Sequence, residues 1–162
     1  MSEVPAFLKA NDRYAASFKK GHLPMPPARR VAVVACMDAR LDPARVLGLE
    51  EGDAHVIRNA GGRAADAVRS LVISQQLLGT REVVVVHHTD CGMLTFTDAQ
   101  LRRKVRDDLG VETDEAFLAF ADLEQSVRDD VRAIRESRVL LKDAPVTGFI
   151  YDVRTGRLRQ VE

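Results

Sequence analysis

The sequence predicts an α/β fold with a mainly parallel central sheet flanked by helices, an N-terminal helical arm and a C-terminal β-hairpin. Three short apolar runs alternate with segments of helical periodicity, which favours parallel strands joined by crossover helices. A proline-rich stretch then separates an arm at 1–28 from one domain at 29–162. The length of 162 residues suits a single domain with one sizeable core.

The arm is predicted to contain a helix over residues 5–20. A loose apolar stripe supports this helix, and its members are Phe7, Leu8, Tyr14 and Phe18. Gly21 ends the helix, and the prolines that follow predict an extended connector.

The domain begins with a predicted strand over 30–37 (RVAVVACM), a continuous apolar run of the kind that is buried on both faces. A short helix over 42–49 follows, because its first residue is a capping aspartate and the next is a proline. A second strand covers 55–58. The later elements, in order, are a helix at 64–78, a strand at 82–88, a helix at 97–109, one or two helices within 114–139, and a hairpin of strands 146–153 and 157–161 around Thr155-Gly156.

Composition excludes several classes of function. Lysine plus arginine and aspartate plus glutamate number 24 each, so no basic excess indicates a nucleic-acid or anionic-membrane partner. No apolar run approaches the roughly 20 residues that span a bilayer, and residues 1–10 do not resemble a secretory signal. We therefore expect a cytoplasmic protein, in which a disulfide between the only two cysteines is the less expected use of them.

Two motifs combine residues that suit zinc. Cys36 ends the first predicted strand, while His88 and Cys91 follow the third, so all three are expected at the same edge of the sheet. Thiolate and imidazole are preferred zinc ligands, and three protein ligands leave a fourth position open for water, as in catalytic sites. Each cysteine alone could instead be a small buried apolar residue. His87 competes with His88, because neighbouring strand residues point to opposite faces and spacing does not decide between them.

Asp38 and Arg40 follow the first candidate ligand directly. Asp38 could bind zinc as a fourth ligand and close the site. Alternatively, it could pair with Arg40 and accept a hydrogen bond from zinc-bound water or hydroxide. A solvent-exposed turn pair is the third possibility.

The segment Asn59-Ala60-Gly61-Gly62 follows the second strand. Its glycines allow positive φ angles and close backbone approach, so Asn59, Gly61 and Gly62 could line a substrate pocket. A simple tight turn explains the segment equally well. No Walker-type or dinucleotide-binding glycine motif is present in the sequence.

The motifs CMDAR at 36–40, RNAGG at 58–62 and HHTDCG at 87–92 together resemble the β-class carbonic anhydrases, in particular their small bacterial and archaeal branch. The resemblance covers most of residues 28–162. It implies reversible hydration of carbon dioxide to bicarbonate and a proton through zinc-bound hydroxide, with one zinc per subunit in the domain at 29–162. It also implies that Cys36, His88 and Cys91 are the zinc ligands and that Asp38 and Arg40 form the family's Asp–Arg dyad.

The same resemblance implies a homodimer or homotetramer in which the arm at 1–28 embraces a neighbouring subunit. Val33 stands where some family members carry the tryptophan of a bicarbonate-responsive pocket, so regulation through such a pocket is not expected. Two alternatives remain at this point. One is a carbonyl sulfide or carbon disulfide hydrolase on the same scaffold, and the other is a non-catalytic zinc-binding or thiol-sensing module with a fully protein-ligated metal.

Overall fold

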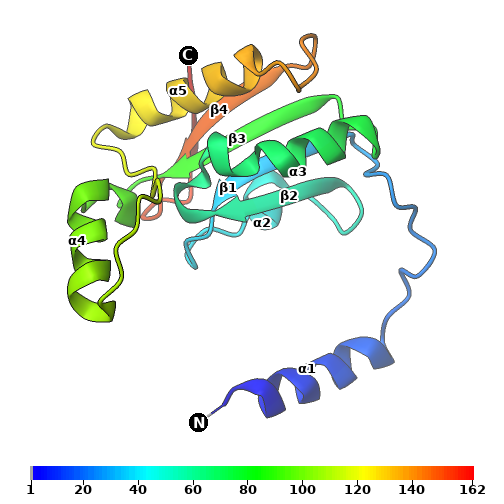
Figure 1. Ribbon diagram of the computed structural model, residues 1–162. Helices are drawn as coiled ribbons and strands as arrows, with labels where there is room; N and C mark the ends of the chain where they lie inside the picture. Colours follow the sequence, from blue (N-terminus) through cyan, green and yellow to red (C-terminus); the bar gives the residue numbers. More distant parts are fainter. Residues whose placement is uncertain (1) are drawn as a thin grey trace.

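A five-stranded sheet forms the centre of the computed structural model, which describes residues 2–162 (Figure 1). The strand order is β2-β1-β3-β4-β5, and every neighbouring pair is parallel except β4 and β5. The mainly parallel sheet is therefore confirmed, and so is the C-terminal hairpin, whose first strand also pairs with β3. The strands are β1 (Val31–Cys36), β2 (Ala54–Asn59), β3 (Glu82–His88), β4 (Val146–Tyr151) and β5 (Leu158–Val161).

Helices cover the two faces of the sheet unequally. Two long helices, α3 (Ala64–Gln76) and α5 (Leu123–Glu136), pack on one face, and the short α2 (Pro43–Leu47) lies on the other (Figure 1). Alternate residues of β3 serve the two faces: Val85 packs with α3 and α5, whereas Val86 belongs to the cluster beneath α2. Because both faces are buried, the central strands are apolar without alternation, as the sequence predicts.

Capping residues set the starts of the helices. The Asp42 side chain accepts hydrogen bonds from the backbone N–H groups of Ala44 (3.1 Å) and Arg45 (3.4 Å), which confirms the predicted start of α2. Thr97 and Gln100 form a reciprocal capping box at the start of α4 (Asp98–Leu109).

Two helices stand away from the sheet. The arm helix α1 (Val4–Ala16) and α4 bury no residue, and both project beyond the body of the protein (Figure 1). The helix predicted over 5–20 ends at Ala16, since the next residues form a turn and then the connector. Among residues 2–162, no helix combines the length and the apolar character needed to cross a membrane.

The prediction of one or two helices within 114–139 is confirmed by α5, which begins well after residue 114. Residues 111–121 form an irregular loop, and helix begins only after Asp122, whose side chain caps α5. The Asp98 carboxylate holds this loop by accepting hydrogen bonds from the backbone N–H groups of Phe117, Leu118 and Ala119. Leu118 has a φ of 60°, which is outside the right-handed helical region.

Candidate metal centre

The three predicted ligands lie together at the carboxyl edge of the sheet. Cys36 is the last residue of β1, His88 is the last residue of β3, and Cys91 follows in the next turn. Because β1 and β3 are parallel neighbours, with Ala35 opposite Val86, their ends are side by side. One ligand atom from each of the three residues lies within 4.8 Å of the other two, and all three residues are buried. The predicted meeting of two separate motifs at one edge is therefore confirmed.

The orientation of the His88 ring suits a metal ligand. Its Nδ1 atom lies 2.9 Å from the carbonyl oxygen of Thr89, which can only accept a hydrogen bond, so Nδ1 carries the proton. The Nε2 atom then presents a lone pair. It is buried and has no hydrogen-bond partner within residues 2–162. A buried acceptor without a partner is costly, and a metal ion at this position would satisfy it.

His87 points to the opposite face of β3. Its Nδ1 atom lies 2.9 Å from the hydroxyl oxygen of Ser126, and its Nε2 atom lies 3.0 Å from a carboxylate oxygen of Asp130. The ring also stacks on Phe120, with 5.5 Å between the ring centroids. His87 is thus a buried residue that contacts Ser126 and Asp130, and it is His88 that groups with the two cysteines.

The two thiols are prepared for a cation. The hydrogen bond from the Cys91 thiol lowers the pKa of Cys36 to about 4, with further contributions from His88 and from backbone N–H groups, including that of Gly61. The same sharing of a proton, together with burial, raises the pKa of Cys91. A divalent cation between the two sulfurs would replace the shared proton and stabilise both thiolates. Two cysteine sulfurs and one imidazole fit zinc.

Asp38 faces Arg40 and lies outside the set of three ligands. Its Oδ1 atom accepts hydrogen bonds from the backbone N–H (2.9 Å) and Nε (3.0 Å) of Arg40, and its Oδ2 atom accepts one from Nη2 (2.8 Å). These contacts hold the pKa of the Asp38 carboxyl well below its usual range. Its Oδ2 atom is 3.7 Å from His88 Nε2, so the ionised carboxylate borders the ligand set. The predicted Asp–Arg pair is confirmed as a contact.

Sequence reasoning missed Asp90, which lies between His88 and Cys91. Arg40 donates a hydrogen bond from Nη1 to Asp90 Oδ2 (2.7 Å) and another from Nη2 to the Asp90 carbonyl oxygen (3.0 Å). The Arg40 guanidinium lowers the pKa of the Asp90 carboxyl. The only signal in the sequence is an acidic residue inside the His-x-x-Cys motif, and nothing there links it to Arg40, which is 50 positions away.

The glycine turn after β2 has a packing role. An added Cβ at Gly62 would lie 2.9 Å from the backbone nitrogen of Cys36 and 3.1 Å from the carbonyl oxygen of Val86, so only glycine fits. An added Cβ at Gly61 would meet the side chains of Met93 and Phe120, which form an apolar wall there. The Asn59 side chain closes the turn, because it donates to the carbonyl oxygen of Arg63 and accepts from the backbone N–H of Arg63. The pocket role of Asn59, Gly61 and Gly62 stays a prediction.

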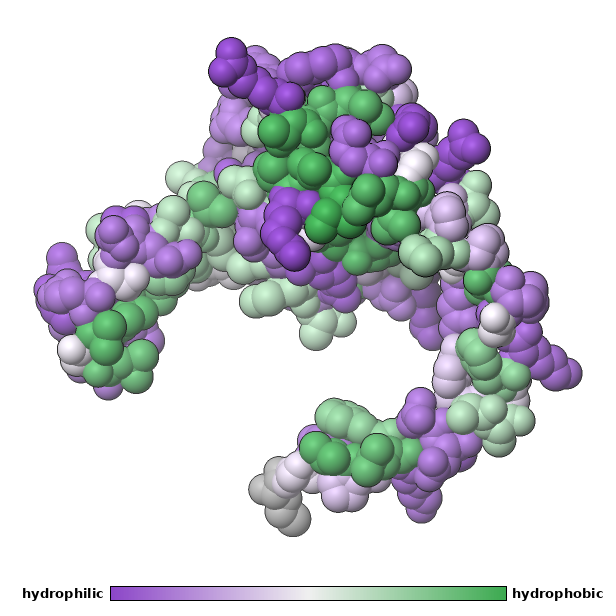
Figure 2. Space-filling view, turned by 45° about the vertical axis from the view of Figure 1, so that its right-hand side comes forward, coloured by the Kyte–Doolittle hydropathy of each residue, from purple (hydrophilic) through white to green (hydrophobic). Residues whose placement is uncertain are grey.

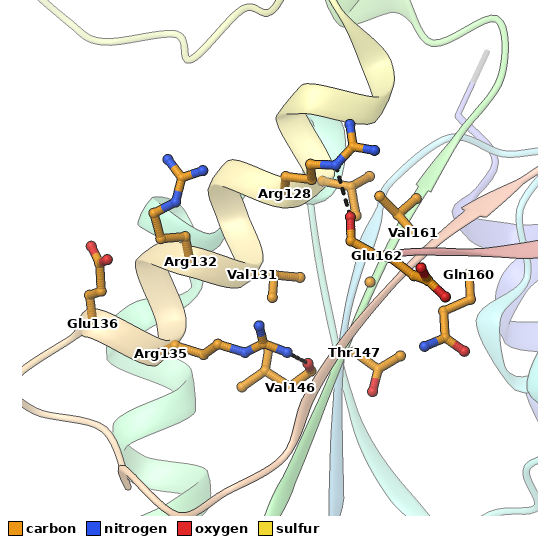
Figure 3. A pocket seen from close by; sticks show the side chains of 12 residues that line it. Arg128, Val131, Arg132, Arg135, Glu136, Val146, Thr147, Gln160, Val161 and Glu162 are labelled. Carbon is orange, nitrogen blue, oxygen red and sulfur yellow. Dashed lines mark hydrogen bonds between the residues drawn. The ribbon is translucent and has the colours of Figure 1, made fainter.

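A hollow lies between α5 and the strands β4 and β5, away from the candidate metal centre. It has a volume of about 420 Å³ and is lined by arginines of α5 and by residues of β4 and β5 (Figure 3). Arg128 donates to the carbonyl oxygen of Glu162, and Arg135 donates to that of Val146, so these arginines tie the helix to the strands. None of the three candidate zinc ligands lines this hollow.

Comparison with known proteins places the chain among relatives of matching length. The family model described as "Carbonic anhydrase" matches residues 31–158. The chain is 48% identical to beta-carbonic anhydrase 1 of Mycobacterium tuberculosis, and the match covers 99% of each chain. It is 34% identical to carbon disulfide hydrolase of an Acidianus species, over 97% of this chain and 88% of that one. A solved carbonic anhydrase from Streptococcus mutans is 51% identical, with a TM-score of 0.95 over 100% of this chain and 99% of that chain.

Proposed function

This chain belongs to the β-carbonic anhydrase family, and on that premise we propose that Cys36, His88 and Cys91 hold one zinc ion at which carbon dioxide is hydrated. The enzyme is a carbonic anhydrase, a lyase that interconverts carbon dioxide and water with bicarbonate and a proton. The observation that supports the zinc assignment best is the buried cluster of two sulfurs and an unpartnered imidazole nitrogen. A non-catalytic zinc-binding or thiol-sensing module no longer competes, because relatives at 48–51% identity are carbonic anhydrases.

The residues around the cluster have different roles in the proposed reaction. Zinc, when bound, lowers the pKa of a coordinated water and so supplies a nucleophile near neutral pH. Arg40 keeps Asp38 ionised and oriented, so that its carboxylate would accept a hydrogen bond from a water held beside the three candidate ligands. The apolar wall of Met93 and Phe120 beside Gly61 suits carbon dioxide, which has no net charge or dipole.

We further propose that the fourth zinc position is open to water in the resting enzyme. The Asp38 carboxylate lies next to the ligand set, with Oδ2 at 3.7 Å from His88 Nε2, and its oxygens are committed to Arg40. A carboxylate held in a bidentate contact with arginine loses that contact if it turns away to bind a metal.

The arm at 1–28 is proposed to embrace a second subunit and so to form a homodimer, or a tetramer of two such dimers. Large apolar side chains of the arm are exposed on the single chain, including Phe7 (65%) and Leu8 (63%). Figure 2 shows hydrophobic side chains gathered on the side of the arm helix that faces the open space below the body. The sheet face under α2 also has half-buried apolar residues, such as Val84 and Phe149, that a second copy could cover. We also propose the cytoplasm as the location of the enzyme, which cell fractionation would test.

Zinc content and hydration rate of matched histidine variants test the proposed metal site. We expect the purified protein to contain one zinc per chain and to hydrate carbon dioxide in a stopped-flow assay. His88→Ala should lose the zinc and at least 100-fold in rate, because an open three-ligand site keeps only two ligands. His22→Ala, which alters an exposed histidine of the connector, should retain both.

Two results would contradict the proposal. The first is wild-type protein that is active without zinc, and the second is full zinc occupancy in His88→Ala. The same samples should be assayed for sulfide release from carbon disulfide, since carbon disulfide hydrolases are relatives at 31–34% identity. We expect carbon dioxide to be the better substrate, and the opposite preference would identify the alternative hydrolase.

A further inference from the structure

Arg40 is held by two acidic residues that come from different parts of the fold. Asp38 is two residues before Arg40 on the same loop, whereas Asp90 belongs to the turn after β3. Together the two residues accept four hydrogen bonds from the guanidinium group, with lengths of 2.7–3.0 Å. A contact between Arg40 and Asp38 alone could swing as a unit, because both side chains belong to one short loop. Asp90 adds the anchor on a second element.

The backbone around Asp90 is shaped for this contact. Asp90 has a φ of 57°, in the left-handed region that aspartate and asparagine tolerate better than most side chains. In this conformation both its carboxylate and its carbonyl oxygen accept hydrogen bonds from Arg40. Its side chain is 66% exposed, so packing does not account for its placement. An exposed pair of this kind adds little to stability, and its effect is to fix the direction of the guanidinium group.

We propose that Asp90 is a positioning residue that fixes Arg40 and, through Arg40, aims the Asp38 carboxylate beside the metal ligands. This inference rests on the proposed function of the same site. Asp38 Oδ2 lies only 3.7 Å from His88 Nε2, so a small rotation changes what the carboxylate faces. With Asp90 removed, Arg40 and Asp38 can move together, and Asp38 is free to turn toward the metal position and close it.

The test compares Asp90→Ala and Asp90→Asn with wild type. We expect Asp90→Ala to keep one zinc per chain while its kcat/KM falls about tenfold, as small misplacements of catalytic groups do. Asp90→Asn should recover most of that loss, because asparagine tolerates the positive φ and its amide oxygen can accept the hydrogen bond from Nη1. Asp107→Ala, which removes an exposed acid that contacts the Arg106 side chain on α4, should match wild type.

Two further measurements separate positioning from a merely structural role. In the Arg40→Ala background, Asp90→Ala should cause no additional loss, because its effect passes through Arg40. The absorption spectrum of the cobalt(II)-substituted protein should differ between Asp90→Ala and wild type, because a change of fourth ligand alters the coordination geometry.

Each remaining outcome overturns one specific claim. Equal kcat/KM and equal cobalt spectra for Asp90→Ala and wild type overturn the role of Asp90. Additive losses in the double variant do the same, and so does loss of zinc from both Asp90 variants, which would make Asp90 a structural part of the ligand turn. Absence of zinc and hydration in the wild type instead overturns the proposed function of the site.

Discussion

Gly62 lies where two strands leave no room for a side chain, directly behind Cys36. Its φ is 69°, and an added Cβ would press on the backbone of both β1 and β3. Gly79, at the end of α3, has a similar φ of 75° but nothing within 4 Å of an added Cβ. Substituting each glycine in turn therefore separates the energetic cost of a left-handed backbone, present at both positions, from the cost of crowding, present only at Gly62.

We predict that Gly79→Ala lowers the free energy of unfolding by about 1–2 kcal/mol, the usual cost of a left-handed conformation for alanine. Gly62→Ala should cost about 1–3 kcal/mol more, because the backbone must shift to admit the methyl group. Urea unfolding monitored by circular dichroism measures both values. Equal losses in the two variants would show that the close approach at Gly62 has no energetic weight.

For individual residues, the sequence indicates the candidate zinc ligands but not the side chains that hold the neighbouring Asp38 and Arg40 in place. Cys36 and Cys91 could be predicted because strand ends and ligand chemistry are local features of the chain. The choice of His88 over His87 needed the family resemblance, since alternation along a strand defines two faces without saying which one holds the metal. The contact between Asp90 and Arg40 could not be predicted, because it depends on side-chain directions across two loops.

The α4 helix and the loop after it form one unit through Asp98. This carboxylate accepts hydrogen bonds from three successive backbone N–H groups of the loop, at 2.9, 3.3 and 3.0 Å. Phe120, near the end of this loop, packs against Gly61 and stacks on the His87 ring. Residues 114–121 lie in this loop and not in α5, and the sequence could not predict that boundary because it depends on the contacts with Asp98. The strands were predicted within two residues of their bounds because continuous apolar runs mark burial on both faces.

Asp98 should make the stability of this unit depend on pH. The backbone hydrogen bond from Ala119, followed by those from Phe117 and Leu118, lowers the pKa of Asp98. Because the folded pKa is below the unfolded one, the stabilisation is fully present above the unfolded pKa of about 4 and is lost as the pH falls through the folded pKa. We therefore expect Asp98→Ala to be less stable than wild type at pH 7 and the difference to shrink on acidification.

Urea unfolding of both proteins at a series of pH values from 7 to 3 checks this expectation. Asp108→Ala, on the same helix, controls for the loss of a surface carboxylate that contacts only a lysine side chain. A difference in the free energy of unfolding between Asp98→Ala and wild type that stays constant over the whole pH range would contradict a stabilising role of the ionised Asp98 carboxylate.

At the scale of the whole molecule, the arm helix α1 extends from the body with its large apolar side chains exposed. The sequence predicted the arm because prolines separate it from the domain, but an apolar stripe on a helix does not reveal which surface it covers. The half-buried apolar residues on the sheet face under α2 offer a surface that the arm of a second copy could cover.

A single charge on the arm should therefore weaken the proposed association. Burying a phenylalanine side chain contributes about 1.5–3 kcal/mol, so Phe7→Asp should raise the dissociation constant roughly tenfold to a hundredfold. Sedimentation velocity over a range of concentrations measures the change. Lys9→Ser, on the same helix, should leave the assembly as it is, and an unchanged assembly in Phe7→Asp would argue against the arm as the interface.

The placement of the two adjacent histidines of β3 depends on the register of this strand with its neighbours. Both imidazoles are fully buried, on opposite faces of a strand that is paired on both sides, with Ala35 opposite Val86 and Tyr151 opposite His88. A slip of β3 by one residue toward the carboxyl edge would turn every side chain to the other face and would bring the His87 ring to the position that His88 occupies beside the two thiols. If zinc binds at the proposed site, we expect its capture during refolding to report the step in which β3 pairs with its neighbours in the native register.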